Sequence, residues 1–393
     1  MIKLIKNTFF NEKETKEKLC RFIMNSEKLS MGDKCREFEE KFSEYQGREY
    51  SVLYNSGSSA NLAVIQSSLN LGLLNEGDKV GFSALTWATN VMPLVQLGLR
   101  PVPIDVSFKN LNVNSWNLLG LKEDLNALFI TNLLGFCGDL DKIKEICDEK
   151  RITLIEDNCE SLESRLKGKK LGNFGLASTF SFFVGHHLST IEGGMACTDD
   201  EELYNMLIMV RAHGWGRNLN SGFREKLREE HGIDDFYENY AFYTLGYNLR
   251  PTEITGFLGC EQIKYLEEMC DKRNKNFLDF YESTKNNDRL HKLDLDHMDF
   301  VSNFSFPLVF KDEKESHLSR EKFRKIAETR PIVGGNMVCQ PFFKKCPKEL
   351  GKRYSLPNSE EIHSNGFYFP NNPELTFDEK KKIIDLLNGK MYS

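Results

Sequence analysis

The sequence predicts an α/β protein in which helices cover a mostly parallel sheet, followed by a second, smaller domain. From Tyr50 onward, short apolar runs alternate with helical stretches, as in βαβ units. The chain of 393 residues exceeds the size of a typical single hydrophobic core, so we expect two domains. A hydrophobic content of 40% and a charged content of 28% are typical of an ordinary globular protein.

The elements follow in order along the chain. The first 45 or so residues predict helices separated by a polar turn at 30–33. A long helix from Ile254 to Asn286 is expected to lead into the second domain, so we place the domains at 1–253 and 254–393. The predicted strands of the large sheet are residues 50–54, 79–83, 100–105, 127–132, 153–156, 177–183 and 195–198. The second domain is predicted to contain strands 304–310 and 366–369, and helices near 318–328 and 377–387.

Charge and hydropathy argue against two classes of partner. The formal net charge is −6, and Lys and Arg are interspersed with Asp and Glu, so we expect no nucleic-acid partner. No apolar run approaches the roughly 18 residues that a membrane span requires, so we expect no membrane. Residues 1–7 lack the apolar core of a signal peptide, which predicts a cytoplasmic protein.

The ten cysteines do not form a recognisable ligand pattern. There is no Cys-x-x-Cys, and the closest two cysteines, Cys339 and Cys346, are seven residues apart. Buried, reduced thiols explain this usage better than a disulfide framework does. We therefore predict no metal site.

A histidine pair follows the sixth predicted strand. An apolar run ends in Gly185-His186-His187, and Gly193-Gly194 leads into the next strand. Two imidazoles therefore lie on a loop between strands, where catalytic groups are common. An imidazole with a pKa near its ordinary value of about 6.5 can transfer protons at neutral pH.

Three other strand ends also carry polar or aromatic groups. Gly57 and Ser58 begin an amphipathic helix, whose N-terminal N–H groups could bind an anion, although a simple helix cap is the alternative. Trp87 follows the second strand, where core packing is the alternative. Asp157 and Glu160 follow the fifth strand, where surface charges are the alternative.

The stretch from Ser181 to Gly194, Ser-Phe-x-x-x-His-x-x-x-x-x-Glu-Gly-Gly, resembles the cofactor-lysine segment of the DegT/DnrJ/EryC1/StrS sugar aminotransferases. This resemblance covers about residues 15–390 and implies the type I fold of pyridoxal-phosphate (PLP) enzymes, which is aspartate aminotransferase-like. That fold has a large domain with a mixed seven-stranded sheet and a smaller C-terminal α+β domain. His186 stands where the family has the lysine that tethers PLP. Imidazole cannot form that covalent link, so we expect noncovalent PLP or pyridoxamine phosphate (PMP).

The resemblance also assigns roles to other residues. It implies a homodimer with shared active sites, because one contact comes from the neighbouring subunit. The phosphate contacts map to Gly57, Ser58 and Ser181, the ring contacts to Trp87, Asp157 and Glu160, and the contact from the neighbour to Asn248.

A second stretch is similar to the histidine-bearing branch of the same family, the nucleotide-sugar 3-dehydratases. It reads Thr-Arg-x-x-x-x-Gly-Asn…Gln-Pro over residues 329–341. The resemblance implies that Arg330 binds a nucleotide phosphate and that Asn336 and Gln340 bind sugar hydroxyls. His187 and Arg250 complete the predicted substrate-binding set, and a domain-packing loop is the alternative for residues 328–342.

The branch implies loss of the C3 hydroxyl from a nucleotide-linked 4-keto-6-deoxy sugar. His186 would act as acid and base, Asp157 would keep the ring nitrogen protonated, and L-glutamate would supply the amino group. The loop 215–243 lacks the cysteine cluster of the family's iron-sulfur CDP-sugar dehydrases, which favours a GDP-linked sugar. The sequence leaves open CDP, a hexose or a heptose, a reductase partner, and the role of the insertion at 219–240.

Three other interpretations remain open. The protein could be a sugar aminotransferase that uses Lys169 or Lys170, or an iron-sulfur dehydrase that works with a reductase. A non-catalytic sugar-nucleotide binder is the third.

Overall fold

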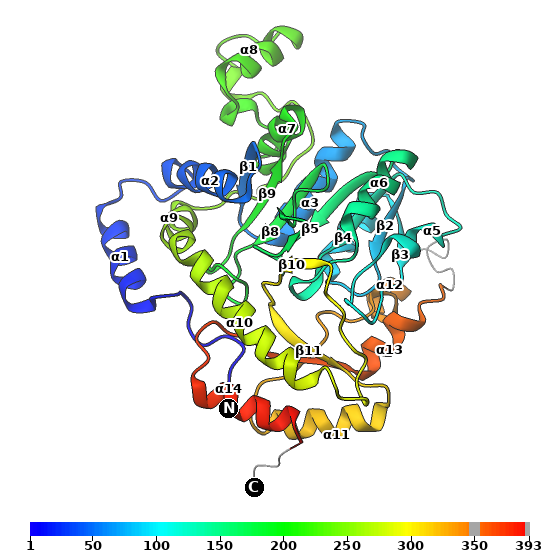
Figure 1. The fold of residues 1–393 in the computed structure, drawn as a ribbon. Helices are drawn as coiled ribbons and strands as arrows, with labels where there is room; N and C mark the ends of the chain where they lie inside the picture. Colours follow the sequence, from blue (N-terminus) through cyan, green and yellow to red (C-terminus); the bar gives the residue numbers. More distant parts are fainter. Residues whose placement is uncertain (346–353, 390–393) are drawn as a thin grey trace.

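A computed structural model describes residues 1–345 and 354–389 and contains a seven-stranded mixed sheet (Figure 1). The strand order is β1-β9-β8-β5-β4-β2-β3, and β9 runs antiparallel to both of its neighbours while the other six strands share one direction. The strands are β1 (Tyr50–Tyr54), β2 (Lys79–Ser83), β3 (Arg100–Ile104), β4 (Ala127–Thr131), β5 (Thr153–Asp157), β8 (Ala177–Ser181) and β9 (Gly194–Thr198).

Both faces of this sheet are buried, which explains its near-continuous apolar strands. In β4, Ala127 and Phe129 belong to one hydrophobic core, while Leu128 and Ile130 belong to a second core on the other face. The helices of the large sheet are α2 (Asp33–Gln46), α3 (Gly57–Asn70), α4 (Met92–Gln96), α5 (Ser115–Leu119), α6 (Leu140–Lys150) and α7 (Glu201–Arg211).

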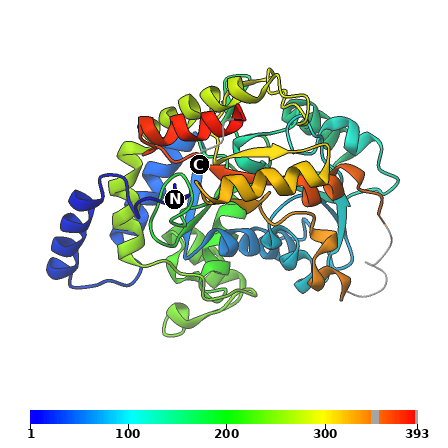
Figure 2. The ribbon, with the colours of Figure 1, turned by 90° about the horizontal axis from the view of Figure 1, so that it is seen from below.

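The C-terminal part forms a three-stranded antiparallel sheet in the order β11-β13-β12. Helix α14 packs on the long helix α10, and Figure 2 shows both helices above this sheet. A further small sheet joins β6 (Arg165–Leu166), β7 (Lys169–Lys170) and β10 (Met298–Phe300). The remaining bounds are α1 (Glu12–Asn25), α9 (Glu253–Gln262), α10 (Leu266–Thr284), β11 (Ser305–Val309), α11 (Glu313–Arg324), β12 (Arg330–Pro331), α12 (Pro341–Lys344), α13 (Pro357–Asn365), β13 (Gly366–Pro370) and α14 (Phe377–Leu387).

The predicted strands agree with the observed strands to within two residues at each end, but two helices differ. The helix expected over 254–286 is interrupted by a 3₁₀ turn at Ile263–Tyr265. The helix expected near 318–328 starts earlier, because the side chain of Asp312 accepts a hydrogen bond from the Glu315 N–H and caps α11. The proposed domain boundary at 253/254 remains a prediction.

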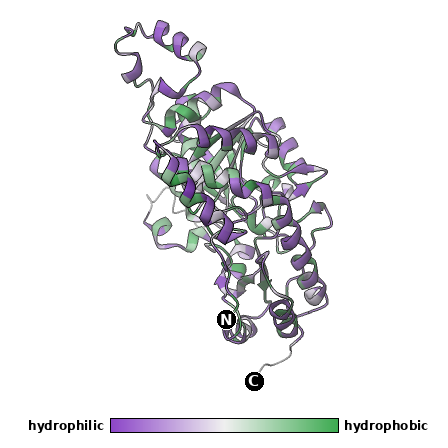
Figure 3. Ribbon diagram, turned by 90° about the vertical axis from the view of Figure 1, so that its left-hand side faces the viewer, coloured by the Kyte–Doolittle hydropathy of each residue, from purple (hydrophilic) through white to green (hydrophobic). Residues whose placement is uncertain are grey.

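The insertion at 219–240 contains a helix, α8 (Ser221–Glu230), that projects from the body of the protein (Figure 1). In Figure 3 this projection is largely hydrophilic. Three exposed aromatic residues, Phe236, Tyr237 and Tyr240, follow α8. In the described part of the chain, no helix is long and apolar enough to cross a bilayer.

Candidate active site

The candidate site lies at the carboxyl ends of the parallel strands. Strands β2, β4, β5 and β8 run in the same direction, so the loops that follow them meet at one edge of the sheet. A cavity of about 540 Å³ opens there. Residues of the seven-stranded sheet and of the sheet β11-β13-β12 line it. Eight predicted site residues line it: Gly57, Ser58, Trp87, Asp157, Glu160, Ser181, His186 and Arg330.

The N-terminus of α3 forms a close-fitting cradle in this cavity. A Cβ atom at Gly57 would lie 2.7 Å from Cβ of Ser181 and 3.1 Å from Sγ of Cys159, so only glycine fits. The first N–H groups of a helix have no partner within the helix and favour an anion. A Cβ at Gly194 would lie 2.3 Å from the Ser56 carbonyl, which explains why the following strand begins with glycine.

Asp157 is buried at the end of β5, and three donors fix its carboxylate. Asn61 and Asn90 donate their side-chain N–H groups to Oδ2 at 2.9 and 2.8 Å. The Cys159 N–H donates to Oδ1 at 2.9 Å. These hydrogen bonds fix the orientation of the carboxylate. It can therefore face a cationic group in the cavity.

His186 lies half-buried on the cavity wall, in the loop between β8 and β9. The backbone N–H of His186 donates to the Phe183 carbonyl at 2.8 Å. The centroid of the imidazole ring lies 5.2 Å from that of the Phe304 ring. Burial lowers the pKa of His186 to about 4, although the charge of Asp157 and the backbone of Cys159 oppose this shift. The imidazole is therefore neutral at pH 7 and can accept a proton.

Glu160 is the second titratable group with a shifted pKa. Burial raises the pKa of Glu160 to about 8, while the Leu134 N–H, which donates to Oε2 at 2.9 Å, opposes the shift. The neighbouring charge of Asp157 also raises the pKa of Glu160. At pH 7 Glu160 is therefore mostly a neutral acid, which can donate a hydrogen bond into the cavity.

This shift predicts a pH-dependent stability of the cofactor-free protein. A carboxyl group whose pKa rises from 4.5 unfolded to about 8 folded adds stability below pH 4.5, and this contribution is lost as the pH rises toward 8. We expect Glu160→Gln to remove that loss. Urea denaturation at pH 5, 6, 7 and 8 measures the difference between the two proteins. A difference that stays constant over this range would contradict the prediction.

Asn336 and Gln340 do not line the cavity. The Gln340 side chain donates to the Gly334 carbonyl at 2.8 Å, and the Asn336 side chain accepts from the Val338 N–H at 3.0 Å. A Cβ at Gly334 would lie 3.3 Å from Cε3 of Trp87, so this turn packs against the indole. Both polar residues hold a loop that supports Trp87, and their predicted sugar contacts have no geometric support in this conformation.

Three further predicted residues also lie away from the cavity wall. The ring of His187 is buried behind the wall, with Nε2 2.9 Å from the Ser302 carbonyl oxygen. Asn248 and Arg250 are exposed, and the Arg250 Nε donates to the Asn248 side chain at 3.0 Å. Within one chain, neither reaches the cavity.

No lysine lines the cavity among the residues that the structure describes. Lys170 forms an ion pair with Glu163 at 2.9 Å and lies over the ring of Tyr45. Lys169 lies over the ring of Phe174. Neither lysine is placed to bind a cofactor aldehyde, which argues against the interpretation that uses them.

The cysteines within 1–345 and 354–389 are all free thiols, and Cys346 lies outside these ranges. No group of three or more His, Cys, Asp and Glu side chains in these ranges could hold a metal ion. Cys159 lines the cavity, and burial raises its pKa well above the ordinary value.

Several cavity residues were missed by sequence reasoning. Asn90 and Asn61 hold Asp157, but their roles depend on partners 67 and 96 residues away. Tyr368 stands opposite Arg330 in the β13–β12 pair. Leu4 and Ile5 come from the N-terminal segment, whose sequence carries no motif. Asn90 ends the 3₁₀ helix Ala88–Asn90, seven residues after β2, so no strand-end signal marked it.

The residues present fit a PLP-type cofactor. The glycine cradle and the α3 N-terminus suit its phosphate, the fixed Asp157 carboxylate suits its ring nitrogen, and Trp87 offers an exposed aromatic face. The fold and this cavity define an aspartate aminotransferase-like PLP enzyme in which none of the described lysines lines the cofactor cavity.

The chain belongs to the DegT/DnrJ/EryC1/StrS aminotransferase family, whose model matches residues 11–388. It is 35% identical to the GDP-4-keto-6-deoxy-D-mannose 3-dehydratase of Yersinia pseudotuberculosis over 378 residues, which cover 93% of each chain. It is 28% identical to the lipopolysaccharide biosynthesis protein RfbH of Salmonella typhimurium, covering 88% of this chain and 82% of that protein.

Solved structures agree with these matches. A crystal structure of a GDP-4-keto-6-deoxymannose 3-dehydratase variant with bound GDP-perosamine has a TM-score of 0.89 at 31% identity and covers 98% of this chain and 100% of that one. Another structure of that enzyme, with a trapped PLP-glutamate adduct, has a TM-score of 0.87 at 31% identity and the same coverage. The predicted family, fold class and cofactor are therefore confirmed.

Proposed function

We propose that this protein is a PLP- and PMP-dependent 3-dehydratase of a nucleotide-linked 4-keto-6-deoxy sugar, with GDP as the favoured nucleotide. One observation carries the proposal. His186 occupies the position of the family's lysine, on the wall of a cavity that no described lysine lines. The similarity to GDP-4-keto-6-deoxy-D-mannose 3-dehydratases supports the choice of substrate and the place in deoxysugar biosynthesis.

When bound, the aminated cofactor supplies an amine for the C4 ketone and an electron-accepting ring. The charge of Asp157 keeps the ring nitrogen protonated. Ser58 and Ser181, together with the N-terminus of α3, hold the phosphate in place of a covalent tether. Glu160, as a neutral acid at pH 7, would hold the ring from the cavity wall by donating a hydrogen bond to it.

His186 moves the proton. Its neutral imidazole accepts a proton beside the sugar, and the resulting imidazolium is acidic because burial disfavours its charge. It therefore gives the proton up readily to the oxygen that leaves C3. One residue thus serves as base and then as acid.

Arg330 is the cationic residue among the described cavity residues, and it suits the diphosphate of the nucleotide. The cofactor phosphate and the nucleotide diphosphate together need more polar partners than Arg330 and the two serines provide. The exposed positions of Asn248 and Arg250 fit a contribution from a second copy of the chain. A homodimer with shared sites is therefore part of the proposal, as is the cytoplasmic location predicted from the sequence.

The stoichiometry gives a sharp test. Loss of the C3 hydroxyl without a new substituent is a two-electron reduction, and oxidation of L-glutamate to 2-oxoglutarate supplies the electrons. We expect one 2-oxoglutarate, one ammonia and a product lighter by one oxygen atom for each sugar consumed. Incubation with PLP, L-glutamate and the GDP- or CDP-linked 4-keto-6-deoxy sugar, followed by mass spectrometry and an ammonia assay, measures all three.

Other outcomes would overturn this proposal. A product that keeps the nitrogen, without ammonia, would identify an aminotransferase. Borohydride treatment of the PLP-loaded wild-type protein should leave no cofactor on any lysine. A labelled Lys169 or Lys170 would show that a tether exists after all.

A further inference from the structure

The N-terminal segment forms part of the cavity wall. Ile2 donates its N–H to the Ile326 carbonyl at 2.7 Å and accepts from the Glu328 N–H at 2.9 Å. The Leu4 N–H donates to the Glu328 carboxylate at 2.7 Å. These hydrogen bonds fix the start of the chain beside β12, which carries Arg330.

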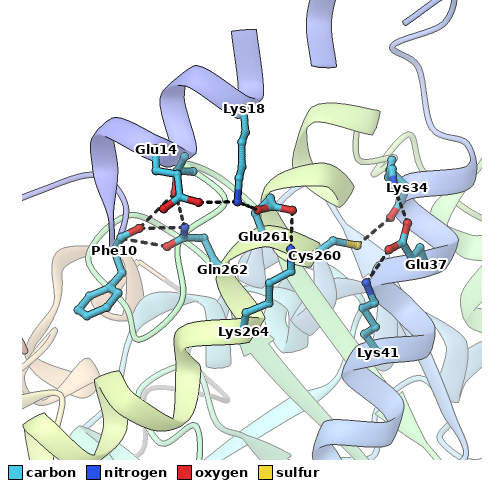
Figure 4. A network of polar contacts seen from close by, with 11 residues as sticks. Phe10, Glu14, Lys18, Lys34, Glu37, Lys41, Cys260, Glu261, Gln262 and Lys264 are labelled. Carbon is cyan, nitrogen blue, oxygen red and sulfur yellow. Dashed lines mark hydrogen bonds and ion pairs between the residues drawn. The ribbon is translucent and has the colours of Figure 1, made fainter. Parts of the chain in front are cut away.

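The other end of the segment is fixed as well. Lys6 donates to the Glu374 carbonyl at 2.9 Å and pairs with Glu379. The Phe10 N–H donates to the Gln262 side chain at 2.9 Å, and Gln262 donates back to the Phe10 carbonyl at 3.1 Å (Figure 4). Leu4 and Ile5 are therefore held between two anchors, one at Ile326 and Glu328 and the other at Gln262 and Glu374.

Leu4 and Ile5 face the same part of the cavity as His186. If Gly185, the residue before His186, carried a Cβ atom, that atom would lie 3.5 Å from Cδ1 of Ile5 and 3.3 Å from the Phe183 ring. The Phe304 ring is tilted by 30° to the imidazole, so Phe304, Phe183 and Ile5 form an apolar wall beside His186.

The cavity is thus divided by polarity. The serines and Asp157 lie at the strand ends, where the cofactor fits, while Ile5, Phe183 and Phe304 lie beside Gly185 and His186. The side chains of Leu4, Ile5 and Phe304 offer no hydrogen-bond donor or acceptor to a hydroxyl group. A sugar substituent that contacts these three side chains, and not the imidazole, is buried without a polar partner.

Sugar geometry decides which substituent this is. In the proposed reaction C4 reacts beside His186, and C5 is bonded to C4 and carries C6. The C6 group and the C3 hydroxyl therefore both lie within two bonds of C4. The hydroxyl takes its proton from His186, which leaves the C6 methyl as the substituent that needs no polar partner. We propose that Ile5, together with Leu4, forms the contact surface for the C6 methyl group and thereby selects 6-deoxy over 6-hydroxy sugars. This inference rests on the proposed function.

The selection follows from burial. A methyl group gains free energy when it is buried among apolar side chains, whereas a buried hydroxyl loses its hydrogen bonds to water. Apolar pockets of this kind discriminate by about 10- to 200-fold. The N-terminal segment would therefore determine specificity without taking part in proton transfer.

Binding of two stable sugar nucleotides tests this inference without turnover. GDP-mannose and GDP-6-deoxymannose differ in the C6 hydroxyl, and calorimetry with the PMP-loaded protein measures both affinities. We expect the wild type to bind the 6-deoxy sugar about tenfold or more tightly. The side chains of Val and Thr have nearly the same shape, but Thr carries a hydroxyl group. Ile5→Val should therefore keep the preference for the 6-deoxy sugar, and Ile5→Thr should reduce it.

The control pair is Ile23→Val and Ile23→Thr, at a partly exposed isoleucine on α1, which should not change the ratio. Equal ratios in the two Ile5 variants, or a wild type without preference, would overturn the inference. The proposed function can survive that result, because dehydration is assayed separately. If the wild type binds neither sugar nor dehydrates the keto sugar, both proposals fail.

Discussion

Replacing His186 by asparagine should lower the turnover of the 4-keto-6-deoxy sugar by about 10²- to 10⁴-fold, the usual contribution of a proton-transferring side chain. Asparagine cannot accept the proton, but it keeps the polarity of the position. The affinity for PMP should change little, because Ser58, Ser181 and Asp157 hold the cofactor. Steady-state kinetics and fluorescence titration of PMP measure the two effects.

His187→Asn is the matched control, since it changes the adjacent histidine in the same way. The ring of His187 is hydrogen-bonded to the Ser302 carbonyl behind the cavity wall. We therefore expect a loss of thermal stability with kcat retained. A large rise in KM for this variant would instead support the substrate contact predicted from the sequence. Equal losses of kcat in both variants would contradict the role given to His186.

Replacing Asp157 by asparagine should reduce turnover by about 10²- to 10³-fold, because removal of one electrostatic stabiliser typically costs this much. The ring nitrogen would lose its charged partner. The amide would also present N–H groups to the donors Asn61 and Asn90. Turnover and the absorbance spectrum of the bound cofactor measure the effect, since the spectrum reports the protonation of the ring.

Asp105→Asn provides a matched control. Asp105 also follows a strand of the large sheet and accepts three hydrogen bonds, from the Asn358 N–H and from the N–H and hydroxyl of Ser359. It lies outside the cavity, so its loss should weaken the start of α13 and leave the cofactor spectrum unchanged. An unchanged spectrum in Asp157→Asn would refute the pairing with the ring nitrogen.

Local patterns were sufficient to predict the large sheet and the centre of the site. Strand ends carry their own signals, because an apolar run that stops at Asp157 or at His186 places those residues at the sheet edge. The resemblance of the stretch from Ser181 to the glycine pair to the family's cofactor-lysine segment then implied that His186 replaces the lysine. Eight of the predicted residues therefore meet in one cavity.

Contacts between distant segments could not be predicted in the same way. Asn336 is buried because its loop pairs with Leu85 on another strand end, a contact between residues 251 positions apart in the sequence. Leu4 is bound to Glu328, 324 residues away. Neither residue differs in type from those of an ordinary loop, so composition and periodicity do not reveal such partners.

The N-terminal segment has a practical consequence for experiments. Its fourth and fifth residues line the cavity, and its second residue is hydrogen-bonded to Ile326. A purification tag fused next to this segment would add bulk beside the cavity wall and weaken those hydrogen bonds. Kinetic constants measured on such a fusion should therefore be compared with those of the cleaved protein before any conclusion on substrate preference is drawn.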